Sequence, residues 1–300
     1  MILPRLSKFL FLSMLLIFIG TLARIDRVFF KRNHSFCIRF IYSSLDNRPE
    51  WDLPPPSTAE VAQLDEVLKQ KFHYLAKGCH CYAFISDDQQ YVIKFHRYAS
   101  HMRIFPWLNH PFSYQFSEHR KEILKHNMQK LAENLQSYKN SAEDLKDETG
   151  LIMLHINRSD TLQRHVTLID ATQAEYRVPL DQVSFILQRK AELIYPTLDK
   201  LISERKIDAA KQVVTNVIHL IADCCKKGYV DEDPVLRKNY GLIADRAIHI
   251  DVGDLVKNEK IQLRENYIPH VKEMTQSLRV RLEKHYPELV SHYDSEIASL

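Results

Sequence analysis

Three aspartates and an asparagine surround one short predicted hairpin in the second half of the chain. Asp231, Asp233 and Asn239 precede its first strand, and Asp251 follows its second strand. Carboxylate and amide oxygens are the hard ligands that Mg²⁺ takes in proteins, usually together with substrate phosphates. Asp and Asn also favour turns, which gives the same residues a purely structural explanation. The pattern is therefore compatible with a magnesium–phosphate site and with ordinary turns.

A second candidate for phosphate chemistry is Lys94, in the stretch YVIKFHR (91–97). This stretch and the runs FHYLAKG (72–78) and CYAFIS (81–86) are rich in β-branched and aromatic residues, and Gly78 and the turn SDDQQ join them. Such runs predict three successive antiparallel strands. On this pattern alone, Lys94 could bind a phosphate or lie solvated at a strand edge.

The remaining periodicity predicts the elements that must position these residues. Ser57 and Glu60 form a capping box, which predicts a helix through about Phe72. An apolar stripe with spacings of three and four residues predicts a long helix over 124–145. Further strands are predicted at 149–156, 165–171, 174–180, 183–191 and in the late hairpin, and further helices at 211–228 and 266–282. This order predicts an α+β fold with two lobes.

The N-terminal stretch FLFLSMLLIFIGTLA (9–23) is almost wholly apolar, and more basic residues follow it than precede it. The positive-inside rule then predicts a single-pass membrane protein with its main domain in the cytoplasm. The alternative is an exported protein, released by cleavage of a signal peptide at Thr21-Leu22-Ala23. The segments predicted here are a membrane anchor or signal segment with a basic flank (1–32) and a proline-containing linker (33–56).

The charge balance limits the partners. Lys and Arg number 41 and Asp and Glu number 38. Because no strong net field results, we expect no nucleic-acid polymer as a partner. The expected partners are the membrane, through the N-terminal segment, and a nucleotide.

Taken in order, these motifs resemble the protein-kinase-like superfamily, including its small-molecule and atypical kinases. LAKGCHCYAF resembles a degenerate Gly-rich loop that keeps Gly78, and VIKF resembles the strand whose lysine, here Lys94, binds the α- and β-phosphates. FILQRKAE (185–192) resembles the hinge strand. DEDPVLRKNYGLI resembles a catalytic loop and IDVGD resembles the D-F-G motif, which makes Asn239 and Asp251 the expected magnesium ligands. The layout is also similar to an uncharacterised family from chlamydia-like bacteria.

This resemblance implies a protein-kinase-like two-lobed fold with a truncated C-terminal lobe, preceded by an N-terminal hydrophobic helix. It divides the chain into an N-lobe-like domain (57–192) and a reduced C-lobe-like helical domain (193–300). It implies ATP and Mg²⁺ in the cleft between the lobes and phosphoryl transfer to a small molecule or to the chain itself. The alternative is a catalytically inactive pseudokinase that acts as a binding or scaffold module.

The chain departs from the family pattern in its catalytic loop and in its glycine loop, and the glutamate partner of its lysine has more than one candidate. His-Arg-Asp is missing, so the catalytic carboxylate could be Asp233 or Asp231. The lysine of the family pairs with a glutamate from the long helix, and Glu143 is the expected partner, with Glu118, Glu122 and Glu148 as alternatives. Two of the three loop glycines are replaced, which weakens the expected approach to phosphate.

Overall fold

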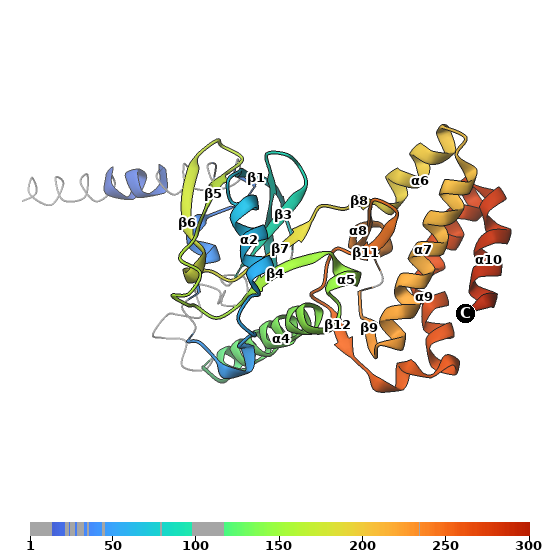
Figure 1. Ribbon diagram of the computed structural model, residues 1–300. Helices are drawn as coiled ribbons and strands as arrows, with labels where there is room; N and C mark the ends of the chain where they lie inside the picture. Colours follow the sequence, from blue (N-terminus) through green and yellow to red (C-terminus); the bar gives the residue numbers. More distant parts are fainter. Residues whose placement is uncertain are drawn as a thin grey trace, which may run out of the picture.

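The structure is a computed structural model. It describes residues 14–21, 24, 28, 33–34, 36–43, 46–78, 80–97, 117–233 and 235–300; the side chains of 117–120 and 124 are also left undescribed. The described elements form two parts, a strand-rich part whose last strand ends at Arg189 and a helical part whose first helix begins at Ile194 (Figure 1).

The strand-rich part is built on one mixed sheet of seven strands in the order β4-β7-β3-β2-β1-β5-β6. The strands are β1 (Lys71–Lys77), β2 (Cys81–Ser86), β3 (Tyr91–His96), β4 (Leu151–His155), β5 (His165–Ile169), β6 (Glu175–Pro179) and β7 (Phe185–Arg189). The predicted antiparallel succession of β1, β2 and β3 is confirmed. The pairing of β1 with β5 is parallel, so the sheet is mixed.

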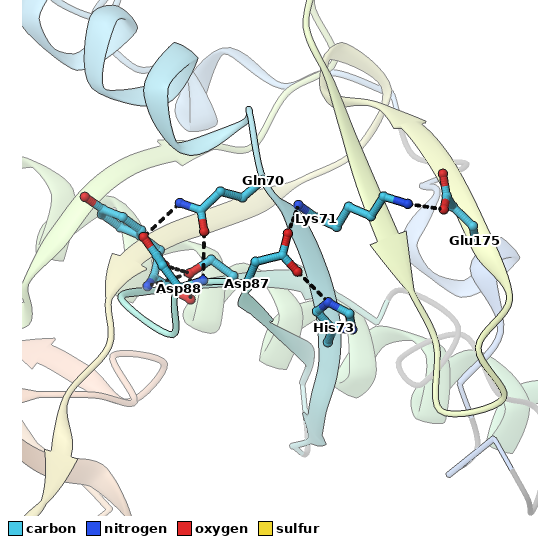
Figure 2. A network of polar contacts seen from close by, with 8 residues as sticks. Gln70, Lys71, His73, Asp87, Asp88 and Glu175 are labelled. Atoms are coloured by element: carbon cyan, nitrogen blue, oxygen red, sulfur yellow. Dashed lines mark hydrogen bonds and ion pairs between the residues drawn. The ribbon is translucent and has the colours of Figure 1, made fainter.

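The acidic turn between β2 and β3 joins three strands through its side chains (Figure 2). Asp87 accepts hydrogen bonds from the Lys71 backbone at 2.9 Å and from His73 Nε2 at 2.7 Å, both on β1. Asp88 accepts one from Gln70 Nε2 at 2.8 Å. The bonds to Lys71 and His73 lower the pKa of Asp87. These two aspartates therefore have a structural role in holding the start of β1 against the β2–β3 hairpin.

Two helices pack beside this sheet. Helix α2 (Thr58–Val67) starts at the predicted capping box, in which Ser57 and Glu60 bond to each other's backbone. It ends earlier than predicted because the chain enters β1 at Lys71. Helix α4 (Ser117–Asp144) is the predicted long helix, and α5 (Lys146–Thr149) continues from it to Gly150, whose φ of +60° suits glycine. In Figure 1, α4 runs along the sheet towards the helical part.

The helical part consists of α6 (Ile194–Ser203), α7 (Ile207–Lys226), α9 (Arg264–His285) and α10 (Val290–Ser299), which pack side by side (Figure 1). The apolar face of α7 is fully buried among them. As predicted, Gly228 terminates α7: it follows the C-cap residue Lys227 and has a φ of +86°. The core of this part continues into α4 through Leu131, Leu135 and Tyr138.

Two small sheets lie where the two parts meet. The predicted late hairpin is β10 (Tyr240–Ile243) and β11 (Arg246–His249), preceded by the short helix α8 (Leu236–Asn239). Strand β8 (Glu192–Leu193) pairs with β10, so the chain crosses from the large sheet to the hairpin directly after β7. Strand β9 (Tyr229–Asp231) pairs with β12 (Leu255–Lys257). The pairing of β9 with β12 was not predicted.

The segment predicted as a linker, 33–56, is packed into the fold. Phe36 and Ile41 are buried in the core of the strand-rich part, with 2% and 0% exposed. Trp51 is buried in the other core, where the short 3₁₀ turn η2 (Pro49–Trp51) packs on α4. The packed structure therefore begins well before the Ser57 helix cap.

The predicted single-pass membrane localisation is wrong. Within the ranges of the chain that the structure describes, no helix combines the length and the apolar character needed to cross a bilayer. Residues 14–21 of the predicted anchor are helical, and residues 9–13, 22 and 23 lie outside the described residues.

Candidate functional site

Lys94 lies in the middle of the large sheet, on β3 between β2 and β7. Side chains alternate between the two faces of a strand, and the neighbouring Ile93 and Phe95 are fully buried in the core on one face. Lys94 therefore points to the opposite face, where its Nζ donates a hydrogen bond of 2.6 Å to the carbonyl of Ile250. The two residues are separated by 156 positions, so this contact joins the large sheet to the loop that carries Asp251.

The loop over residues 250–255, which we call the Asp251 loop, leaves β11 and enters β12. The Ile250 N–H donates to the Asn239 carbonyl at 2.6 Å, which fixes the start of the loop beside α8. Ser137 Oγ donates to the Val252 carbonyl at 2.5 Å and accepts from the Leu255 N–H at 2.7 Å. Helix α4 therefore holds the loop at Val252 and at Leu255. The Asp251 side chain stays exposed.

Gly253 is needed because the backbone approaches α4 closely. A Cβ at this position would lie 2.5 Å from Asn134 Nδ2 and 3.3 Å from the Tyr138 hydroxyl. The same Asn134 Nδ2 donates to the Gly253 carbonyl at 2.9 Å. Glycine at this position is therefore a packing requirement.

Asp231 is buried, and its carboxylate is fully engaged in positioning neighbouring groups. Its Oδ2 accepts hydrogen bonds from the Tyr240 hydroxyl at 2.8 Å and from His249 Nε2 at 2.7 Å. Its Oδ1 accepts from the Asp233 N–H at 2.9 Å. Burial raises the pKa of Tyr240, and the charge of Asp231 raises it further. These bonds tie the hairpin to the segment that presents Asp233.

Asp233 and Asn239 meet side by side on that segment. Asn239 Nδ2 donates to the Asp233 carboxylate at 2.9 Å and to the Asp233 carbonyl at 3.1 Å. This contact leaves Asn239 Oδ1 as the atom that could bind a metal. Asp233 is only half-buried, unlike Asp231, so its carboxylate is the better placed of the two to reach a bound molecule.

Strand pairing brings the segment with Asp231 and Asp233 next to the Asp251 loop. The backbones of Asp231 and Leu255 are partners in the β9–β12 ladder, and the Glu232 N–H donates to the Asp254 carbonyl at 3.0 Å. Burial raises the pKa of Asp254, and the charge of Asp251 raises it further. The charges of Asp233 and Asp231 also raise the pKa of Asp254, whereas His80 lowers it. Carboxylates that repel one another in this way are stabilised by a cation.

The donor set fits Mg²⁺ only as a partial shell. Within the described residues, no group of three or more His, Cys, Asp or Glu side chains can hold a metal ion on its own. Mg²⁺ usually takes one or two carboxylates and completes its shell with waters and substrate phosphates. Asp251 and the amide oxygen of Asn239 match that requirement, provided that a phosphate supplies further oxygens.

The structure does not bring Glu143 to Lys94. Glu143 lies near the end of α4, 3.9 Å from Lys139, and the alternative Glu148 pairs with Lys227 at 2.7 Å. Lys94 takes part in none of the ion pairs formed by the described residues. The α4 side chains that bond to the Asp251 loop, Asn134 and Ser137, are neutral, and Lys94 bonds to a backbone carbonyl.

Gly78 lies in the tight connection between β1 and β2, as predicted. Its N–H donates to the Cys81 carbonyl at 2.9 Å, and its own carbonyl accepts from Arg97 Nη1 at 2.8 Å. A Cβ on Gly78 would make only an ordinary contact of 3.7 Å. The surroundings therefore do not require glycine at this position.

Sequence reasoning missed four residues that shape the site: Asn134, Ser137, Tyr240 and His249. Asn134 and Ser137 carried a usable signal. They stand beside the buried Leu131, Leu135 and Tyr138 on the helical stripe, and polar residues at buried positions need partners from elsewhere in the chain. The nature of those partners, two backbone carbonyls of a distant loop, had no local signal.

A small cavity of about 10 Å³ lies behind this site, lined by residues that include Asp231, His249 and His270. Its size is at the lower limit for one water molecule. His249 Nδ1 and His270 Nε2 are both buried and have no hydrogen-bond partner among the described residues. Because a water needs polar partners, this cavity is a suitable place for one.

No protein-family model matches the chain, and no curated protein matches it. Among solved structures, it is weakly similar to WbdD, described as a bifunctional kinase-methyltransferase. WbdD in a co-crystal with the kinase inhibitor LY294002 is 13% identical, with a TM-score of 0.34 and coverage of 76% of this chain and 46% of WbdD. A second WbdD structure is 13% identical, with a TM-score of 0.32 and coverage of 74% and 43%. The Rv3197–erythromycin complex from Mycobacterium tuberculosis is 14% identical, with a TM-score of 0.29 and coverage of 81% and 61%.

The chain thus spans less than two thirds of each of these structures. The α+β class is confirmed by the mixed sheet and the packed helices. The TM-scores are too low to carry an argument about a fold family or an activity. The predicted relation to a family from chlamydia-like bacteria has no support, because no family model matches.

Proposed function

We propose that this chain is a kinase-like protein that binds ATP and Mg²⁺ between the large sheet and the Asp251 loop and transfers the γ-phosphoryl group. The observation that carries the proposal is the 2.6 Å contact between Lys94 Nζ and the Ile250 carbonyl. It sets a half-buried cation next to Asp251, an exposed carboxylate on a loop that α4 holds in place. A polyphosphate with its metal requires a cation and a carboxylate on the same side of a cleft, and this contact places Lys94 beside the loop that carries Asp251.

Each group has one role in this proposal. Lys94 would exchange the Ile250 carbonyl for phosphate oxygens, and Asp251 and Asn239 would bind the metal. Bound Mg²⁺ neutralises the charge that develops on the phosphates. Asp233 would accept the proton of the acceptor hydroxyl as its oxygen bonds to the γ-phosphorus and ADP leaves. Asp231 would act through Asp233, since it holds the Asp233 backbone and is itself buried.

The acceptor stays a prediction from the sequence, namely a small molecule or the chain itself. The crossing from β7 to β8 supports the hinge interpretation of 185–192, because it links the large sheet to the hairpin that leads into the Asp251 loop. An adenine ring would then bond to the backbone of this crossing, as the resemblance to kinases implies.

Transfer of label from γ-³²P-ATP, in the presence of Mg²⁺, tests the proposal. We expect label on the chain itself or on a supplied small-molecule alcohol, and a loss of at least about 100-fold in Asp233→Asn, as is typical when general-base chemistry is removed. Asp245→Asn is the matched control, since this exposed aspartate lies at the far end of the same hairpin. Equal activity in all three proteins would exclude the assigned role of Asp233.

A second candidate function is a pseudokinase that binds nucleotide without turnover. The observation that favours it is that Lys94 has no ion pair with an acidic side chain among the described residues, because in active kinases that ion pair positions the lysine. Thermal unfolding with and without ATP and Mg²⁺ separates the candidates. A stabilised protein that transfers no label is a pseudokinase, and a protein without any stabilisation contradicts both.

A further inference from the structure

A sizeable cavity lies away from Lys94 and Asp251. It has a volume of about 720 Å³, within the range of pockets that bind small molecules. One wall is the segment 47–56, and the others are α2, the junction of α4 and α5, and β4 with the loop behind it. Leu64, Met153, Leu154 and Leu162 give it an apolar lining. The cavity therefore offers room and apolar surface for a ligand.

The wall formed by 47–56 is fixed by specific bonds. Lys139 Nζ on α4 donates to the carbonyls of Glu50 and Asp52 at 3.0 and 2.8 Å. Asn157 Nδ2, on the opposite side, donates to Asp52 Oδ1 at 2.6 Å. Trp51 between them is only 5% exposed. Because both sides of the segment are bonded, the cavity is preformed, which lowers the entropic cost of binding.

Two basic side chains that line this cavity, Lys146 and Arg164, already form ion pairs with carboxylates. Lys146 forms an ion pair with Glu60, and Arg164 forms a two-pronged pair with Asp65 at 2.5 and 3.1 Å. Such geometry satisfies both charges of a pair. At Lys146 or Arg164, an anionic group of a ligand would have to displace the carboxylate already paired there, and Arg158, which also lines the cavity, has interactions of its own.

Glu143 is the carboxylate of this cavity with the weakest partner among the described residues. Its carboxylate lies 3.9 Å from Lys139 Nζ, which is itself held by the two carbonyls of the 47–56 segment. The Glu143 side chain lines the cavity and is 40% exposed, so it is accessible to a bound molecule. A cationic group on a bound molecule would find there a carboxylate able to accept its hydrogen bonds.

We propose that this cavity binds a small amphiphilic amine, with the apolar body against Leu64 and Met153 and the ammonium group on Glu143. The site is separate from the proposed nucleotide site, and the inference does not depend on that function. It would bring a ligand to the end of α4, the helix that holds the Asp251 loop through Ser137.

Trp51 provides a direct reporter, because it lines the cavity and the chain contains only one other tryptophan. In a Trp107→Phe background, fluorescence of Trp51 is titrated with 4-phenylbutylamine and, separately, with 4-phenylbutyric acid. The two probes share the apolar body and differ in the charge of the head group. We expect a saturable change with the amine in the millimolar range or below, and no saturable change with the acid.

Glu143→Gln should weaken amine binding by about tenfold, the effect of one hydrogen bond to a charged group. Glu133→Gln is the matched control. It makes the same substitution on the same helix, at a residue that pairs with Lys130 at 3.0 Å and does not line the cavity. It should leave the affinity unchanged. The proposal is overturned if a folded protein gives no saturable change with the amine. It is equally overturned if the acid binds as tightly as the amine, or if both variants lose affinity alike.

Discussion

Replacing Ser137 by alanine should destabilise the fold strongly, because its hydroxyl is the buried link between α4 and the Asp251 loop. The side chain is 2% exposed, and it serves one carbonyl and one N–H of the loop at 2.5 and 2.7 Å. Val252 and Leu255, which carry these groups, are also buried, with 0% and 1% exposed. Water therefore cannot replace the lost hydroxyl without opening the contact.

The magnitude follows from the two backbone groups that would be left without a partner. Each buried unsatisfied group costs about 1–3 kcal/mol. Ser137→Ala should therefore lower the free energy of unfolding by about 2–4 kcal/mol, allowing for partial relaxation of the loop. The same change should weaken binding of ATP and Mg²⁺, since the Asp251 loop would lose its attachment.

Ser141→Ala is the matched control. This serine is also fully buried, one turn further along α4, but its hydroxyl donates only to the Ser137 carbonyl of its own helix, at 2.9 Å. Its loss should cost no more than about 1 kcal/mol. Urea unfolding followed by far-UV circular dichroism measures both variants. If Ser137→Ala costs no more than Ser141→Ala, the assigned link between helix and loop is refuted.

Three further outcomes follow from the structure. Burial opposes ionisation of Glu60, but its bonds to Lys146 and Ser57 prevail and lower its pKa to about 2. The ionised carboxylate therefore contributes at most about 3 kcal/mol to the free energy of unfolding. This contribution is fully present above about pH 4.5 and is lost as the pH falls towards 2. The difference in unfolding free energy between wild type and Glu60→Gln should therefore shrink over that range, and a difference that grows would contradict this assignment. Gly241→Ala should destabilise the β8–β10 pairing in urea unfolding, because the new Cβ would lie 2.8 Å from side-chain and backbone atoms of residues 191 and 192; an unchanged midpoint would contradict this. A high-resolution crystal structure should show one ordered water between His249 Nδ1 and His270 Nε2, and a dry cavity would contradict this.

Local patterns predicted most of the elements because their signals lie within a few residues. The β1–β2–β3 succession, the helix cap at Ser57 and the end of α7 at Gly228 are such cases. The parallel pairing of β1 with β5 and the β9–β12 ladder join segments far apart in the chain, and alternation within a strand does not specify a distant partner. Isolated apolar residues in a polar, proline-containing segment, such as Phe36 and Trp51, likewise gave no periodic signal of their burial.

The candidate site was predictable in its residue types and less so in its contacts. The juxtaposition of Lys94 with the loop that carries Asp251 is the arrangement expected from the sequence. The partner of Lys94 was not predictable, since the stripe of α4 shows which residues are buried and not what lies opposite them. Likewise, Asp231 and Asp233 are the same residue type two positions apart, so the sequence does not distinguish them. Only the hydrogen bonds and burial in the fold show that Asp231 is a buried positioning residue and Asp233 an accessible carboxylate.

The most direct test of the central claim is calorimetric titration of the chain with ATP in the presence and absence of Mg²⁺. We predict saturable binding that requires the metal and weakens at least tenfold in Lys94→Met and in Asp251→Asn. Lys71→Met, which removes a lysine of the same sheet that pairs with Glu175 at 2.7 Å, should bind like the wild type. Absence of binding to the folded wild-type chain, or equal binding by the Lys94 and Lys71 variants, would contradict the account.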